Sequence, residues 1–146
     1  MKKKHGWNTW ENYLRVHESV LKRYQSHFVT PSPKYSVIRF TDQYYQIRID
    51  KLELISAKGT YISINIEKDI EVQAGGSKDV ARTVGYSYQS WLKGGGNLIR
   101  YCSPHESHNK FHHKHDYMKD PINPIPVVND EWPHVNEFFD ELIDNY

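Results

Sequence analysis

The stretch Ile62–Glu67, with the sequence ISINIE, decides the fold because its isoleucines alternate strictly with polar residues. A period of two residues puts the three isoleucines on one side of an extended strand and the polar side chains on the other. This segment is therefore predicted to be a β-strand with one buried face and one polar face.

Four further segments show a strand pattern on either side of this one. Apolar residues alternate over Tyr45–Leu54, and the alternation slips by one residue at Asp50-Lys51, which predicts a β-bulge. A glycine-rich turn, Gly94–Gly96, separates the last two segments. The four predicted strands are Tyr35–Phe40, Tyr45–Leu54, Val80–Leu92 and Leu98–Cys102. Their short connections predict an antiparallel sheet of four or five strands over residues 35–102.

Helical periodicity occurs near both ends of the chain, over residues 9–27 and 132–144, where Pro133 suits a first helical turn. Strands grouped together, with helices outside them, are typical of the α+β class. We expect both helices to pack on the sheet in one domain over residues 1–146. The sheet face without helices is then expected to be polar or a binding surface. The apolar arc of the first helix is wide enough for a core and a partner, which is compatible with a homodimer.

Composition excludes several classes of protein. Hydrophobic residues make up 38% of the 146 residues and charged residues 25%, as in a folded chain rather than a disordered one. No apolar run approaches 18 residues, so we expect no membrane span. The basic N-terminus is not followed by the apolar segment of a secretory signal. The only cysteine, Cys102, excludes an internal disulfide and fits the reducing cytoplasm, where we expect the protein.

Five of the nine histidines lie within 11 residues. They are His105, His108, His112, His113 and His115. The surrounding residues, 103–130, show no helix or strand pattern, so we expect a histidine-rich loop. In an extended segment, His113 and His115 would project to one side and His112 to the other.

Three interpretations of this histidine segment stay open. Imidazole titrates near neutral pH, so one histidine can accept a proton while another donates one during reaction at a phosphate, with Arg100, Lys110 and Lys114 as nearby cations. Alternatively, the spacings His105-x-x-His108 and His113-x-His115 suit Zn or another divalent transition metal. The third interpretation is a polar loop whose histidines share no role.

The four remaining histidines are spread along the chain, and we expect no shared role for them. They are His5, His17, His27 and His134. Only His17 lies on the apolar face of the first predicted helix, which is typical of a core or interface histidine.

Several short motifs resemble, in their order, the signature of the TumE-like toxin family. They are Gly85-Tyr86-Ser87-Tyr88, Leu98-Ile99-Arg100-Tyr101, Ser103-Pro104-His105 and Phe111-His112-His113-Lys114-His115. The resemblance covers residues 35–117 and includes the strand with Arg48 and the strand that ends at Glu67. The chain departs from the family pattern at Cys102, where the family has Asp, at Glu106, where it has His, and at Phe111, where it has Pro.

The resemblance implies the toxin of a type II toxin–antitoxin pair, with a helix-turn-helix DNA-binding antitoxin as partner. It implies growth inhibition through RNA cleavage, for which we expect a metal-independent endoribonuclease without a cofactor. The alternatives are a non-catalytic or metal-binding interaction module on the same scaffold, or a metal-dependent hydrolase. The metal ligands would then be His105, His108, His113 and His115.

The resemblance also assigns roles to individual residues. The acid–base candidates are His113, His115 and His105. Glu67 would orient a histidine or act as a base, and Tyr88 would donate a hydrogen bond or stack on a base. The residues expected to bind phosphate are Arg100, Lys114 and Arg48. If the family's aspartate orients a catalytic histidine, Cys102 removes that contact.

Overall fold

The computed structural model describes residues 3–104, 111–128 and 130–146. Its elements are, in chain order, β1 (Asn8–Thr9), α1 (Trp10–Arg23), a 3-10 turn (Gln25–His27), β2 (Ser36–Arg39), β3 (Tyr44–Ile55), β4 (Tyr61–Gly75), β5 (Lys78–Leu92), β6 (Asn97–Cys102), β7 (His113–Asp116), β8 (Ile125–Pro126) and α2 (Val135–Asn145). One sheet has the order β2-β3-β4-β5-β6-β7-β8, and β1 pairs with β5. All of these pairings are antiparallel. The predicted α+β class is confirmed.

The predicted number of four or five strands is wrong, because the sheet has eight within the described residues. The five predicted strands are present as β2 to β6, and each pairs with the next one along the chain. The three additional strands are β1, β7 and β8, with two, four and two residues. With two residues each, β1 and β8 join the sheet through main-chain hydrogen bonds and are too short for an apolar alternation to show.

Part of the predicted histidine-rich loop is also a strand, β7. Its sequence, HKHD, contains no apolar residue, so hydrophobic periodicity gives no signal for it. The register pairs His113 with Cys102 and His115 with Arg100, and thus extends the sheet beyond β6. The expectation of a loop is therefore wrong for His113–Asp116.

The predicted bulge in the second long strand is confirmed. The register between β3 and β4 shifts between Ile49 and Leu52. Lys51 has a positive φ of 55°, and its N–H donates to Asn65 Oδ1 at 2.8 Å. The Asn65 side chain thus satisfies the main-chain donor that the bulge removes from the ladder.

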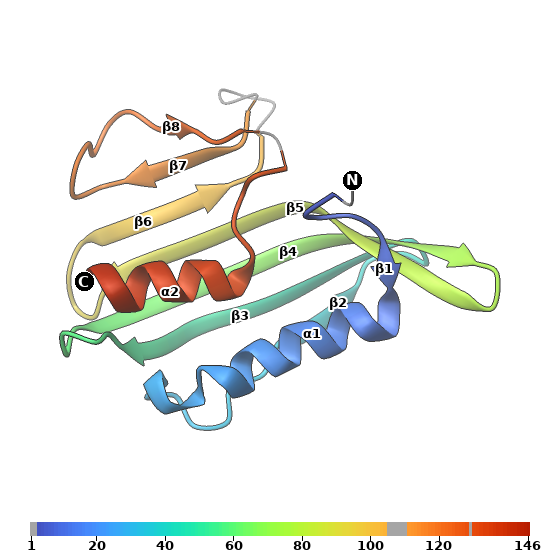
Figure 1. Ribbon diagram of the computed structural model, residues 1–146, viewed down its shortest axis with the longest axis horizontal. Coiled ribbons are helices and arrows are strands. Elements are labelled where there is room, and N and C mark those ends of the chain that lie inside the picture. The colour runs from blue at the N-terminus through green and yellow to red at the C-terminus, as the bar shows by residue number, and fades with distance from the viewer. Residues whose placement is uncertain (1–2, 105–110, 129) are drawn as a thin grey trace.

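Both helices lie on the same face of the sheet, as Figure 1 shows. The three isoleucines of the ISINIE stretch are fully buried in the core cluster beneath them. The predicted helix over 9–27 ends as α1 at Arg23 and is followed by the 3-10 turn. The second helix begins at Val135, two residues after Pro133. The N–H of His134, the residue just before the helix, donates to Glu137 Oε1 at 2.9 Å and so caps the first turn.

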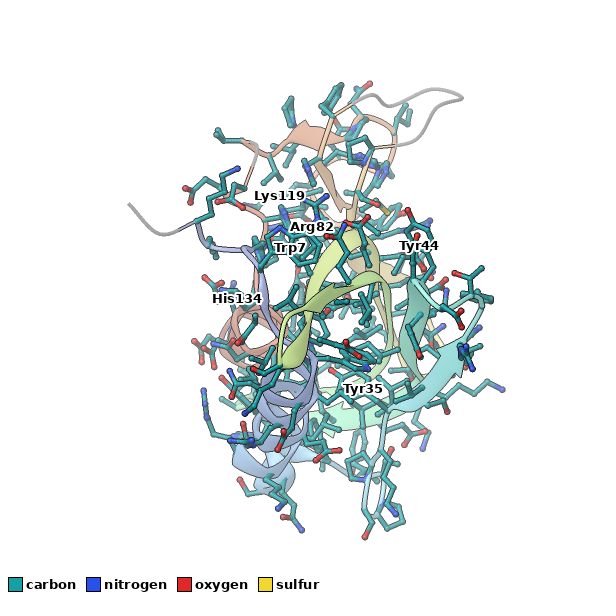
Figure 2. All side chains as sticks on the ribbon, turned by 90° about the vertical axis from the view of Figure 1, so that its right-hand side faces the viewer. Trp7, Tyr35, Tyr44, Arg82, Lys119 and His134 are labelled. Carbon is teal, nitrogen blue, oxygen red and sulfur yellow. The ribbon has the colours of Figure 1, made fainter. Side chains whose placement is uncertain are left out.

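Figure 2 gives the view turned by 90°, in which the helices lie to one side of the sheet. The Arg82 guanidinium lies 4.6 Å from the ring centroid of Trp7, so the N-terminal segment contacts β5. In the described part of the chain, neither helix is long and apolar enough to cross a membrane.

Candidate functional site

The face of the sheet opposite the helices carries a row of polar residues, one from each of five neighbouring strands. The register pairs them directly: Arg48, Glu67, Ser87, Cys102 and His113. Directly opposite residues share a face, with Cβ atoms about 5 Å apart. We call this face the open face, because neither helix covers it.

A second row crosses the open face two residues along each strand. It pairs Gln89 with Arg100 and Arg100 with His115. Because residues two apart on a strand share a face, His113 and His115 lie together on the open face. Arg100, Cys102, His113 and His115 therefore form a two-by-two group on β6 and β7, which we call the Arg–His cluster.

The two imidazoles of the Arg–His cluster contact each other. The ring centroids of His113 and His115 are 5.1 Å apart and the planes are nearly perpendicular, at 89°. His113 Nδ1 donates to the Phe111 carbonyl oxygen at 3.0 Å, so a neutral His113 ring carries its lone pair on Nε2. His115 is half-buried and stacks on Tyr117 with centroids 5.5 Å apart.

Arg100 supplies the cation of the cluster. Among the described residues, its Nε is buried without a hydrogen-bond acceptor. The guanidinium lies beside the thiol of Cys102, which is 1% exposed. Burial raises the pKa of this thiol, and Arg100 opposes the shift only in part, so Cys102 is a protonated, packed thiol rather than a nucleophile.

Glu67 and Arg48 lie on the open face but not beside the histidines. Gln46 Nε2 donates to Glu67 Oε1 at 2.7 Å, and Arg48 Nε donates to Asp50 Oδ2 at 3.2 Å. Three strand spacings separate the backbones of Glu67 and His113, or roughly 14 Å at about 4.8 Å per strand. Glu67 and Arg48 therefore form a polar group separate from the Arg–His cluster, and Glu67 is not in position to orient His113.

Lys114 and Tyr88 lie on the helix-covered face, away from the Arg–His cluster. Lys114 forms an ion pair with Glu141 of α2, and Tyr101 donates to the same carboxylate at 2.7 Å. Tyr88 is fully buried and its ring contacts Phe138 of α2. The alternation that unites His113 and His115 thus directs Lys114 to the opposite side of the sheet.

His112 confirms the expectation that it faces away from its two neighbours. Its Nδ1 lies 2.8 Å from the Tyr86 hydroxyl, and its ring is parallel to Trp132. Burial lowers the pKa of His112, with a smaller contribution from His113. This histidine therefore belongs to the aromatic packing under the N-terminal segment.

Two predicted metal ligands, His105 and His108, lie outside the described residues, as does Glu106. Within the described ranges, no three His, Cys, Asp or Glu side chains gather in a metal-binding arrangement. The metal interpretation of the histidine segment therefore stays a prediction.

Sequence reasoning missed a buried basic group on the helix-covered face. Lys68 is 3% exposed and lies 2.8 Å from His17. A signal was present, because Lys68 is the next residue in the Ile62, Ile64, Ile66 alternation and so must face the core.

The Arg–His cluster combines two imidazoles in contact, a half-buried arginine and a neighbouring aromatic ring. Such a set can transfer protons in both directions and hold a phosphate oxygen. Comparisons of this chain with family models, with curated proteins and with solved structures gave no match.

Proposed function

We propose that this protein is a toxin-like ribonuclease that binds RNA on the open face of its sheet and cleaves it by metal-independent acid–base catalysis. The observation that carries the proposal is the register of β6 and β7, in which Arg100 and His115 are opposite and His113 lies next to both. The resemblance to TumE-like toxins, drawn from the motifs around these residues, supports the same chemistry.

The proposed reaction uses the RNA's own 2′-hydroxyl as nucleophile. The 2′-oxygen bonds to the adjacent phosphorus while the bond from phosphorus to the 5′-oxygen breaks. A general base accepts the 2′-hydroxyl proton, and a general acid donates a proton to the departing 5′-oxygen. The products are a 2′,3′-cyclic phosphate end and a 5′-hydroxyl end.

The histidine pair supplies the base and the acid in this proposal. With rings 5.1 Å apart, both imidazoles can act on one phosphodiester group once the RNA has displaced the surroundings of His113, which is 1% exposed. The Phe111 carbonyl fixes the tautomer of His113, which leaves Nε2 as the proton-accepting atom. Since His115 is more exposed than His113, we assign the direct contact with RNA to His115.

The arginines of the open face bind the phosphates. Arg100 has a buried Nε without an acceptor among the described residues, so a phosphate oxygen would satisfy it. Arg48 lies three strands away and would contact a more distant phosphate, exchanging Asp50 for the RNA. Tyr117, stacked on His115, would receive a base by aromatic stacking.

The proposal includes a cytoplasmic location and a DNA-binding antitoxin as partner. A neighbouring reading frame that encodes a small helix-turn-helix protein would support the pair. Co-expression of that protein should then relieve a growth defect that this chain causes alone.

The function is tested by incubating the purified protein with RNA, with and without EDTA, and identifying the product ends. We expect cleavage that persists in EDTA and leaves 2′,3′-cyclic phosphate. A His27→Gln variant is the matched control, since His27 contacts Ile55 near the other end of the sheet. Absence of cleavage, together with normal growth of a bacterial host expressing the protein, would contradict the proposal. Cleavage abolished by EDTA and restored by Zn²⁺ would favour the metal-dependent hydrolase.

A further inference from the structure

Lys68 of β4 is a buried lysine on the helix-covered face of the sheet. It is 3% exposed, and among the described residues it forms no ion pair with a carboxylate. A buried charge without a partner of opposite sign costs folding free energy, and an apolar side chain at this position would avoid that cost.

The hydrogen bonding of Lys68 is incomplete. His17 Nδ1 lies 2.8 Å from the Tyr13 carbonyl oxygen and must donate to it, so His17 Nε2 accepts from Lys68 Nζ at 2.8 Å. An ammonium carries three donors, and this bond uses one. The rings of Tyr13, Tyr88 and Trp132 lie 5.8–5.9 Å from Nζ and give partial cation–π compensation.

Lys68 lines a cavity of about 120 Å³, and half of the residues in its wall are basic. Lys4 is paired with Glu137 at 2.9 Å, and no described Asp or Glu lines the cavity itself. The basic residues in the wall are Lys4, His5, His17, Lys68 and His134. The cavity has the volume of about four liquid water molecules, at about 30 Å³ each. It can therefore hold a small polyatomic anion.

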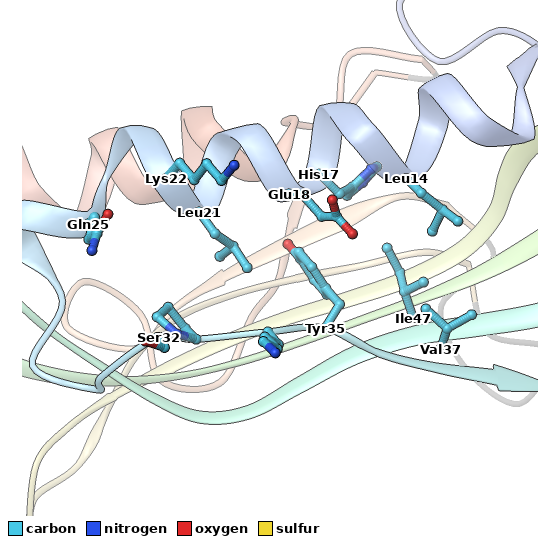
Figure 3. A pocket seen from close by; sticks show the side chains of 12 residues that line it. Leu14, His17, Glu18, Leu21, Lys22, Gln25, Ser32, Tyr35, Val37 and Ile47 are labelled. Carbon is cyan, nitrogen blue, oxygen red and sulfur yellow. The ribbon is translucent and has the colours of Figure 1, made fainter.

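Two buried hydroxyls nearby also need partners. The hydroxyls of Tyr35 and Tyr88 have no hydrogen-bond partner among the described residues. Figure 3 shows Tyr35 directed from the segment before β2 toward α1, where its ring meets His17 edge-on. A larger groove of about 470 Å³ lies between α1 and the segment before β2. His17 borders both this groove and the cavity around Lys68. Buried polar groups left unsatisfied in this way are expected to meet water or an ion.

We propose that the cavity around Lys68 binds a small oxyanion, such as phosphate or a carboxylate, with the Lys68 ammonium as its principal contact. His5 and His134 lie in the wall around the anion, whereas His17 holds Lys68, because both of its ring nitrogens are already bonded. The hydroxyl of Thr83 lies 2.6 Å from that of Tyr13, and when it accepts from Tyr13 it adds a neutral donor in the wall. This site lies on the helix-covered face, whereas the proposed RNA site lies on the open face. The inference does not depend on RNA cleavage.

The titration of these groups is consistent with an anion site. Burial lowers the pKa of Lys68 to about 7 and that of His5 to about 4. Burial lowers the pKa of His17 and that of His134, and the charge of Lys68 lowers both further. The charge of Lys68 lowers the pKa of the three histidines, whereas Asp130 raises that of His5 and His134 and Glu137 raises that of His134. A bound anion would act in the same direction as these carboxylates.

Thermal unfolding with inorganic phosphate, at constant ionic strength set by chloride, tests the site. We expect a saturable rise of a few degrees in Tm for the wild type and loss of this rise in Lys68→Met. Lys22→Met is the matched control, because it removes the same charge from an exposed position of α1 and should keep the response. Replacing phosphate by acetate tests whether a carboxylate produces the same rise in Tm.

A second measurement covers the case in which Lys68→Met fails to fold. Phosphate titration of the wild type should shift the NMR signals of the His17 and His5 rings in a saturable way, while His27 stays unchanged. Absence of a saturable response to both anions overturns the proposal. It is also overturned if the response survives in Lys68→Met but disappears in Arg100→Gln, because phosphate would then bind on the open face.

Discussion

The two faces of the sheet differ in how their polar residues are bonded, although these residues alternate along the same strands. On the helix-covered face, the polar side chains bond to the helices: Lys114 and Tyr101 to Glu141, and Lys68 to His17. On the open face they contact side chains of the sheet itself, as Gln46 does with Glu67 and His113 does with His115.

This difference separates residues that hold the fold together from residues available to a ligand. A charge that bonds to a helix is already used in packing and is expected to affect stability when removed. A charge on the open face makes no contact with either helix that the described residues show, so its removal is expected to affect binding or catalysis. The following variants test this division, from the largest expected effect to the smallest.

The largest effect is expected on cleavage for His115→Asn. Loss of a general acid or base typically lowers the rate by about 10²–10⁴-fold, and Asn keeps much of the shape of the ring. The measurement is the initial rate of RNA cleavage, with circular dichroism to establish that the variant is folded. A His115→Asn protein that cleaves at the rate of the wild type would remove the proposed role of this histidine.

The next effect concerns stability, for Ile64→Ala on the covered face. Ile64 is fully buried, and truncation of such a residue costs about 2–5 kcal/mol. Gln89→Ala, on the neighbouring strand of the open face, should change the free energy of unfolding by less than about 0.5 kcal/mol. Urea unfolding of both variants measures the two values. Equal losses would show that the open face is packed as tightly as the core.

Lys68→Met is expected to raise stability. The pKa of Lys68 is 10.5 in the unfolded chain and about 7 in the folded protein, so between these pH values only the unfolded state binds the proton. Wild-type stability therefore increases as pH rises from 7 to 10.5. The variant should lose this slope and gain about 1–4 kcal/mol at pH 7. A lower stability of Lys68→Met at every pH would contradict the argument.

The smallest effect distinguishes Lys114 from Arg100, two cations that were both predicted to bind phosphate. Lys114→Met removes the ion pair with Glu141 and should cost about 1 kcal/mol while leaving RNA cleavage unchanged. Arg100→Gln should lower cleavage with little change in Tm. The opposite result, with cleavage lost in Lys114→Met, would move the substrate to the helix-covered face.

Strands β3 to β6 and both helices could be predicted because the period of their apolar residues turns one face toward the core. The bulge at Asp50-Lys51 was visible for the same reason, as an interruption of a regular alternation, and the register of β3 confirms it. Strand β7 could not be identified in this way, since His113–Asp116 alternates one set of polar residues with another.

The division of the candidate site between two faces was only partly accessible from the sequence. Alternation alone separates His113 and His115 from His112, and the structure confirms that separation. The position of Lys114 opposite Glu141 depends on the packing of α2, because Glu141 is 27 residues away along the chain and local pattern does not encode it. The meeting of His5, His17 and His134 around Lys68 likewise requires the folded chain, and the expectation that these histidines share no role stays a prediction.

The cavity around Lys68 also has a consequence for synthesis of the protein, because its wall joins the two ends of the chain. The Lys4 N–H donates to Asp130 Oδ2 at 3.0 Å, and the His5 ring stacks on Trp132 with centroids 3.3 Å apart. A chain still growing on the ribosome cannot close this wall until residue 134 has emerged. Until then Lys68 is hydrated and carries its proton. Without an anion in the cavity, completion of the fold above about pH 7 is therefore accompanied by release of that proton from most molecules.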